Sequence, residues 1–186
     1  LAELEQHFVS WLAKVSYAEI AEADWSSAWK EYYKPQHIGE TIVISPSWEE
    51  YRPQPGETVI WLDPGMAFGT GNHPTTAMVI RAMEKYLRPG SRVLDVGTGS
   101  GILAIVAAKL GAAQVLALDI DTLAVEIAQQ NVQLNHVSEQ VTVRYNDLLT
   151  GLEGQYQMIT ANLTADPVLA LAEDAFERLS PAGLLL

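Results

Sequence analysis

The chain has 186 residues, with 11 Lys and Arg against 23 Asp and Glu, a formal net charge of −12, 48% hydrophobic residues and no cysteine. The acidic balance argues against a direct nucleic-acid partner, which would need basic side chains on its phosphates. The lack of cysteine excludes disulfides, thiolate zinc sites and cysteine nucleophiles. The sequence shows neither an apolar run of about 18 residues nor a signal-peptide pattern, so we expect a cytoplasmic protein without a membrane partner.

Residues 1–34 have a helical pattern that places Trp25, Trp29 and Tyr32 at helical spacing. We expect these residues to form a helical linker whose aromatic stripe packs on a neighbouring domain. The chain starts without Met and stops in the apolar run 184–186, which reads like the opening of a strand. We therefore expect a piece of a longer protein, and the linker to be the remnant of an N-terminal substrate-recognition domain.

From residue 35 onward, short apolar or β-branched runs alternate with helical segments. We expect strands over residues 41–44, 58–62, 92–96, 114–119, 141–145 and 157–162, and another from residue 184. We expect helices over residues 75–87, 102–110, 122–135 and 167–179, the last closed by Ser180 and Pro181. Repeated strand–helix–strand units predict an α/β fold with a doubly wound, mostly parallel sheet. We expect residues 35–74 to supply two strands and a ligand-covering loop, and residues 75–186 to form the main domain.

The strand 92–96 leads into the run Gly97-Thr98-Gly99-Ser100-Gly101, which opens a helix. Such glycines let the backbone turn tightly against a ligand, and the helix N-terminus points its N–H groups at it. The third glycine comes too early for the dinucleotide pattern G-x-G-x-x-G, which argues against a nicotinamide dehydrogenase. Asp95 precedes the turn and Asp119 ends the next strand, where an acid binds ribose hydroxyls. We expect Asp121 to cap the following helix instead.

The position of Asp95 discriminates between ligands. A carboxylate beside a pyrophosphate is unfavourable, whereas a ligand with an ammonium group favours one. S-adenosylmethionine has that ammonium group and no phosphate. The pattern therefore predicts a class I methyltransferase with a Rossmann-like fold. The expected cofactor contacts in this part of the chain are Asp95, Gly97, Thr98, Gly99, Gly101, Asp119 and Ile120.

Two later strand ends extend this prediction. Asn146-Asp147-Leu148 follows the third strand of the main domain, where Asp147 would lie near the adenine amino group or belong to an ordinary polar turn. We expect Asn162 to end the fourth strand, next to the place where a class I methyltransferase would transfer the methyl group. The run Asn162-Leu163-Thr164-Ala165 lacks the Pro-Pro-aromatic sequence of methyltransferases that act on bases or glutamine amides. A flat base or amide is therefore a poor candidate substrate.

Residues 63–76 read Asp-Pro-Gly-Met-Ala-Phe-Gly-Thr-Gly-Asn-His-Pro-Thr-Thr, which is richer in Gly, Pro and Thr than a linker needs. This composition is typical of a loop that folds over a ligand, although His73 also fits a place beside a helix cap. Together with the runs 95–101, 119–121 and 161–163, this loop resembles the ribosomal protein L11 methyltransferases, the PrmA family. The resemblance covers about residues 24–186.

The resemblance implies methylation of the α-amino group and of lysine ε-amino groups of ribosomal protein L11, with S-adenosylmethionine as the methyl donor. It also implies that Thr76, Gly97, Asp119 and Asn162 contact the cofactor, and that Phe68 and His73 lie in a loop over its methionine end.

We expect Asn162 to act as the catalytic residue by orienting the amine, without a metal and without a dedicated strong base. The alternatives are a methyltransferase of another protein lysine or a small molecule, and a non-catalytic cofactor-binding module in ribosome assembly.

Overall fold

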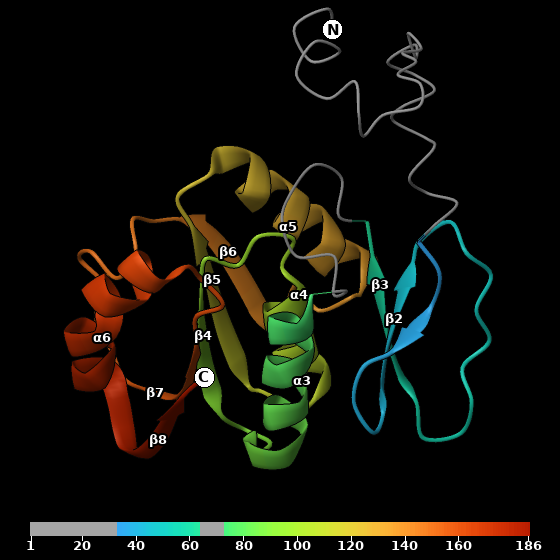
Figure 1. Ribbon diagram of the computed structural model, residues 1–186, viewed down its shortest axis with the longest axis horizontal. Helices are drawn as coiled ribbons and strands as arrows, with labels where there is room; N and C mark the ends of the chain where they lie inside the picture. The colour runs from blue at the N-terminus through green and yellow to red at the C-terminus, as the bar shows by residue number, and fades with distance from the viewer. Residues whose placement is uncertain (1–32, 64–72) are drawn as a thin grey trace, which may run out of the picture. The chain divides into compact units, whose positions relative to one another are not determined.

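The computed structural model describes residues 33–63 and 73–186 (Figure 1). The expected helical linker over residues 1–34 and the expected ligand contact Phe68 lie outside the described residues, apart from the linker's last two positions. Residues from Lys34 onward belong to one compact unit. Within the two described ranges, no helix is long and apolar enough to cross a membrane.

Two sheets organise the described residues. The first contains β1 (Gln36–His37), β2 (Ile42–Pro46) and β3 (Thr58–Leu62). The elements of the larger region are α3 (Pro74–Tyr86), β4 (Arg92–Val96), α4 (Ile102–Lys109), β5 (Gln114–Asp119), α5 (Thr122–Leu134), β6 (Val141–Tyr145), β7 (Tyr156–Thr160), α6 (Ala165–Arg178) and β8 (Leu179–Leu185).

The larger sheet has five strands in the order β6-β5-β4-β7-β8, and all its neighbouring strands are parallel. The chain proceeds from β4 outward to β6, and then returns to the other side of β4 to form β7 and β8. The strand order therefore reverses between β4 and β7, which is where open α/β sheets bind their ligands. This arrangement confirms the predicted doubly wound, mostly parallel Rossmann-like fold.

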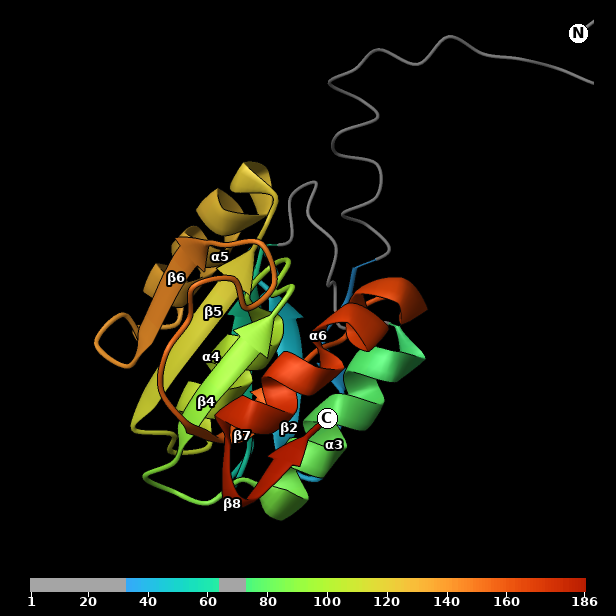
Figure 2. The ribbon, with the colours of Figure 1, turned by 90° about the vertical axis from the view of Figure 1, so that its left-hand side faces the viewer.

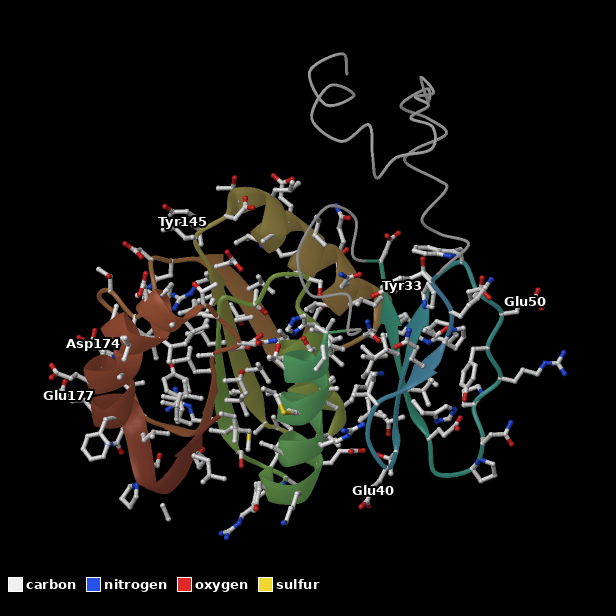
Figure 3. The ribbon with its side chains drawn as sticks, viewed as in Figure 1. Tyr33, Glu40, Glu50, Tyr145, Asp174 and Glu177 are labelled. Atoms are coloured by element: carbon white, nitrogen blue, oxygen red, sulfur yellow. The ribbon has the colours of Figure 1, made fainter. Side chains whose placement is uncertain are left out.

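Separate hydrophobic clusters cover the two faces of this sheet. One cluster joins β4, β5 and β6 to α4 and α5, and α4 is so central that all of residues 102–107 are buried. The other cluster packs Leu171 and Ala175 of α6 against the opposite face. Figure 2 shows α6 in front of the sheet, with α4 and α5 behind it. Asp174 and Glu177 point outward from α6 (Figure 3), so this helix is amphipathic as its spacing requires.

The three-stranded sheet shares the first of these clusters. Its strands β2 and β3 are parallel, while β1 pairs antiparallel with β2. Ile44 and Ile60 lie in the same core as Ile80 and Met83 of α3. The helix also carries Glu84, whose carboxylate accepts hydrogen bonds of 2.8–3.2 Å from the N–H groups of residues 40–42 and the Thr41 hydroxyl. The small sheet is thus fixed to α3 by apolar packing and by one carboxylate.

The structure corrects the sequence prediction at three places. The strand predicted over residues 157–162 ends at Thr160, so Asn162 lies two residues beyond β7. The two-residue strand β1 was not expected. At the C-terminal end, α6 stops at Arg178 and β8 begins at Leu179, whereas the sequence predicted a strand only from residue 184. The register between β7 and β8 shifts inside this strand, so that Leu179 pairs with Tyr156 but Leu184 with Met158. The irregular stretch accommodates Pro181, which cannot donate to a regular ladder.

Candidate functional site

A cavity of about 560 Å³ opens at the carboxyl ends of β4, β5 and β7, where the strand order reverses. It is bounded by the first turns of α3, α4 and α6 and by the segment after β6. The lining residues are Thr76, Val96, Gly97, Thr98, Gly99, Ile102, Leu103, Asp119, Ile120, Asn146, Asp147, Leu148, Asn162, Leu163, Asp166, Pro167 and Ala170.

The Gly-rich turn forms the floor of this cavity. The N–H groups of Gly97 and Thr98 both donate to the carbonyl of Leu118, at 2.8 and 2.9 Å, which ties the turn to the end of β5. Gly97 has a φ of +70°, and a Cβ at this position would collide with the side chain of Leu163. The positive φ therefore favours glycine here, and the Leu163 side chain occupies the space that a Cβ would need.

Asp119 stands at the carboxyl end of β5 and joins two neighbouring segments. Its Oδ2 accepts a hydrogen bond of 2.8 Å from the Gly99 N–H, and its Oδ1 accepts one of 3.0 Å from the Asp121 N–H. Each carboxylate oxygen can accept further bonds, so Asp119 can still bind ligand hydroxyls. Asp121 caps α5 through the Leu123 N–H at 2.9 Å, which confirms its predicted role.

Asp95 lies beneath the turn and does not line the cavity. Its side chain is 1% exposed. The hydroxyls of Thr98 and Thr160 each donate to one of its carboxylate oxygens at 2.6 Å. The carboxylate also accepts a bond from the Ala104 N–H, in the first turn of α4, where the N-cap Gly101 has no side chain.

The surroundings of Asp95 bear on its protonation and on its predicted role. Burial raises the pKa of this carboxyl, against the lowering effect of the bonds from Thr160 and Thr98. The geometry favours a role in holding the turn. Direct contact between Asp95 and a ligand ammonium group stays a prediction.

Asn162 and Thr76 meet on one wall of the cavity. The Asn162 Nδ2 donates to the Thr76 Oγ1 at 2.9 Å, which joins the end of β7 to the first turn of α3. Thr76 is buried, and among the described residues the Oδ1 of Asn162 accepts no hydrogen bond. His73 caps α3 with its Nδ1, which is 3.3 Å from the Thr75 N–H. The wall therefore offers one amide oxygen to a ligand.

The other polar group on the β6 side is the segment 146–148. The Asn146 Nδ2 donates to the carbonyl of Leu148 at 2.9 Å, and Leu148 has a φ of +44°. This local turn belongs to the cavity lining together with Asp147. Beside it, Ile120 is 58% exposed, which leaves a large apolar side chain available at the cavity mouth.

Most of the predicted contacts in the described residues meet at this cavity. Those that line it are Thr76, Gly97, Thr98, Gly99, Asp119, Ile120, Asp147 and Asn162. Gly101 is absent from the lining, and a Cβ on it would lie 3.1 Å from the Cβ of Ala128 on α5. Sequence reasoning missed the α6 residues Asp166, Pro167 and Ala170. The one available signal was that this helix starts directly after Asn162, at the same edge of the sheet.

Comparisons with known proteins agree on one family. A family model described as "Ribosomal protein L11 methyltransferase (PrmA)" matches residues 2–186. The chain is 57% identical over 169 residues to the ribosomal protein L11 methyltransferase of an Exiguobacterium species, a match covering 91% of this chain and 54% of that protein. It is 54% identical over 169 residues to the Bacillus cytotoxicus protein of the same name, with 90% and 54% covered. The chain thus spans about half the length of these curated relatives.

A solved structure also resembles the chain. The crystal structure of a ribosomal protein L11 methylase from Lactobacillus delbrueckii subsp. bulgaricus superposes with a TM-score of 0.77 at 37% identity. The match covers 82% of this chain and 78% of that one.

Proposed function

The chain belongs to the ribosomal protein L11 methyltransferase (PrmA) family, and on that premise we propose that it carries the methyl-transfer core of an enzyme acting on ribosomal protein L11. In this proposal, methyl groups pass from S-adenosylmethionine to the α-amino group and to lysine ε-amino groups of that protein. The substrate is inferred from the names of the relatives, and the residues of the cavity support the choice of cofactor.

The charge of the cavity is the observation that carries the proposal. Three acids, Asp119, Asp147 and Asp166, line it, and no Lys or Arg does so among the described residues. A dinucleotide pyrophosphate would meet repulsion from such a lining, whereas a ligand with a sulfonium and an ammonium group would meet attraction. The residues present therefore fit S-adenosylmethionine and fit nicotinamide dinucleotides poorly.

Different lining residues would contact different parts of the cofactor. Asp119 would hold the ribose hydroxyls, Ile120 would pack on the adenine ring, and Asp147 would lie near its amino group. Gly97, Thr98 and Gly99 would let the backbone approach the middle of the cofactor, and Thr76 would contact its methionine end. Bound S-adenosylmethionine supplies an activated methyl group, so the protein has to align the amine and exclude water.

Asn162 would perform this alignment. Its Nδ2 is held by Thr76, which leaves Oδ1 to accept a hydrogen bond from the incoming amine and to direct the nitrogen lone pair at the methyl group. The amine must first lose a proton, which is easier for an α-amino group, with a reference pKa of about 8, than for lysine at about 10.4. We expect that proton to leave to water or to a nearby loop residue, without a dedicated strong base. The Nδ1 of His73 is engaged in capping α3.

The parts of the enzyme outside this core complete the proposal. We propose that residues 1–34 connect the core to a domain that recognises ribosomal protein L11. A cytoplasmic site of action follows, because the substrate is a ribosomal protein. The chemistry uses no metal, no membrane and no direct nucleic-acid partner.

The decisive experiment incubates the full-length protein with isotopically labelled S-adenosylmethionine and purified ribosomal protein L11, and locates the label by mass spectrometry. We expect label on the N-terminal amine and on lysines. A lack of transfer to this protein, together with transfer to another lysine-bearing protein or a small amine, would favour a different substrate. Cofactor binding without transfer to any acceptor would identify a non-catalytic binding module.

A further inference from the structure

Two asparagines on α5 take the place of a neighbouring strand along the edge of β3. The Oδ1 of Asn135 accepts the Trp61 N–H at 2.9 Å, and its Nδ2 donates to the Trp61 carbonyl at 2.6 Å. Asn131 repeats the pattern with Asp63, accepting its N–H at 2.9 Å and donating to its carbonyl at 3.0 Å. Each asparagine is 1% exposed. We call this pair the amide ladder.

The spacing of the amide ladder follows from the geometry of helix and strand. Four residues along a helix advance about 6.0 Å. Two residues along a strand advance about 6.8 Å. Asn131 and Asn135, four positions apart, can therefore meet Asp63 and Trp61, two positions apart at the end of β3. The edge of β3 would otherwise expose unpaired backbone groups. The ladder thus explains why α5 carries two buried amides.

The two asparagines of the amide ladder, the Asn131 rung and the Asn135 rung, differ in the acceptor of their second side-chain N–H. The second N–H of Asn135 donates at 2.8 Å to the carbonyl of Asn131, inside α5. The second N–H of Asn131 donates at 2.9 Å to the carbonyl of Ser100, inside the Gly-rich turn. Only the Asn131 rung therefore connects the end of β3 with the floor of the cavity.

A second contact brings α5 against the same turn. Ala128, one helical turn before Asn131, is fully buried, and a Cβ on Gly101 would lie 3.2 Å from its Cα. The turn is therefore pressed against α5 at Gly101 and hydrogen-bonded to it at Ser100. On its other side, Gly99 donates to Asp119 at 2.8 Å. The turn has little freedom as long as the Asn131 contact is made.

We propose that Asn131 is a positioning residue for the cofactor cavity: one buried amide fixes the Gly-rich turn relative to the end of β3. This role rests on the proposed binding of S-adenosylmethionine, and Asn131 itself does not line the cavity. Its neutral side chain uses both N–H groups and its oxygen at once, which a carboxylate cannot do because it has no donor.

The test compares two matched substitutions in the full-length protein, Asn131→Asp and Asn135→Asp. Each keeps the side-chain shape, removes two N–H donors and lies at the same burial, Asn131 in the last turn of α5 and Asn135 at its C-cap. They differ in that only Asn131 contacts the Gly-rich turn. The measurements are S-adenosylmethionine affinity by calorimetry, hydrogen exchange of the amides of residues 97–101 without ligand, and the thermal midpoint. If a buried carboxylate prevents folding, Asn131→Ala and Asn135→Ala provide the same comparison.

We expect both variants to lower the thermal midpoint, since each loses buried hydrogen bonds. In the Asn131 variant alone, affinity should fall by about tenfold or more, and exchange in the turn should rise by a similar factor. Equal effects of the two substitutions, or an unchanged turn in the Asn131 variant, would overturn the positioning role. If the unsubstituted protein binds no S-adenosylmethionine, the proposed function fails, whereas the exchange comparison still decides whether Asn131 fixes the turn.

Discussion

In each of two turns of this molecule one carboxylate accepts several hydrogen bonds: Asp95 beside the cavity and Glu84 in the small sheet. Asp95, which is fully enclosed, holds the Gly-rich turn by accepting bonds from the hydroxyls of Thr98 and Thr160. Glu84, which is partly exposed, holds the turn before β2 by accepting bonds from residues 40–42. Both acids join segments that are distant in sequence, but only Glu84 remains in contact with water.

The difference in solvent contact reverses the sign of the pKa shift. Burial raises the pKa of Asp95 and outweighs its hydrogen bonds. Burial also acts to raise the pKa of Glu84, but the bonds from Thr41, Glu40 and Ile42 outweigh it and lower the pKa. The ionised form of Asp95 is therefore costly in the fold, while that of Glu84 is stabilised by it. A carboxylate thus stabilises both turns, but the one beside the cavity is buried and the one in the small sheet is in contact with water.

The largest effect is expected on stability, from substitution of the buried carboxylate of Asp95. Asp95→Ala leaves two buried hydroxyls and the Ala104 N–H without their acceptor, and should lower the free energy of unfolding by about 3 kcal/mol. Urea denaturation measures this loss. A loss no greater than that of a Glu84 substitution would remove the distinction between the two turns.

The next effect is on turnover, without a comparable effect on stability. Asn162→Ala removes the amide that we expect to align the amine, and should lower kcat about 100-fold, a larger factor than the loss of cofactor affinity. Steady-state kinetics with ribosomal protein L11 and calorimetry separate the two quantities. Thr164→Ala is the control, because this nearby N-cap makes no side-chain capping bond and its loss should leave kcat unchanged. Full turnover with normal binding in Asn162→Ala would refute the role of Asn162.

A smaller effect should follow from Asp119→Asn. This change leaves one oxygen to serve the N–H groups of Gly99 and Asp121 and the expected ribose hydroxyls, so affinity for S-adenosylmethionine should fall about tenfold. The matched control is Asp121→Asn, since asparagine is an equally good N-cap. Calorimetry on both variants checks the pair, and similar losses of affinity would show that the effect is not specific to Asp119.

The smallest effect is expected from substitution of the partly exposed Glu84. Glu84→Gln weakens the bonds to residues 40–42 where water can partly replace them, so the free energy of unfolding should fall by about 1 kcal/mol, with cofactor affinity unchanged. Glu126→Gln, at an exposed position of α5, should change neither quantity. A tenfold loss of cofactor affinity in Glu84→Gln would show that the small sheet takes part in the site.

The contribution of Glu84 should depend on pH. Because the pKa of Glu84 is lowered in the fold from its ordinary value of 4.5, the unfolded chain binds its proton more readily. Its stabilisation is then complete above pH 4.5 and disappears as pH falls through the lower pKa of the folded state. The stability difference between the unsubstituted protein and Glu84→Gln should therefore shrink on acidification. Denaturation curves from about pH 7 to about pH 3 test this, and a constant difference would contradict it.

Much of the fold could be predicted because the signals are local. The strands β4, β5 and β6 have the bounds that alternation and apolar runs indicated, and α3, α4 and α5 end within a residue or so of the expected positions. The Gly-rich turn and Asp119 were predictable as well, since glycines after a buried strand and an acid at the next strand's end have few other uses. The irregular start of β8 was not, because Ser180 and Pro181 suit a helix end as well as a bulge.

The sequence alone determined the order of strands and helices and the glycines of the turn, because each depends on residues close together in the chain. Tertiary structure decided which way the polar side chains near the cavity point. Asp95 faces Thr160 rather than the cavity, and Asn131 reaches Asp63. These partners lie 65 and 68 positions apart in the chain, so their contacts depend on the tertiary fold. The pairing of β4 with β7 brings Asp95 to Thr160, and the packing of α5 against β3 brings Asn131 to Asp63. No local pattern encodes either contact.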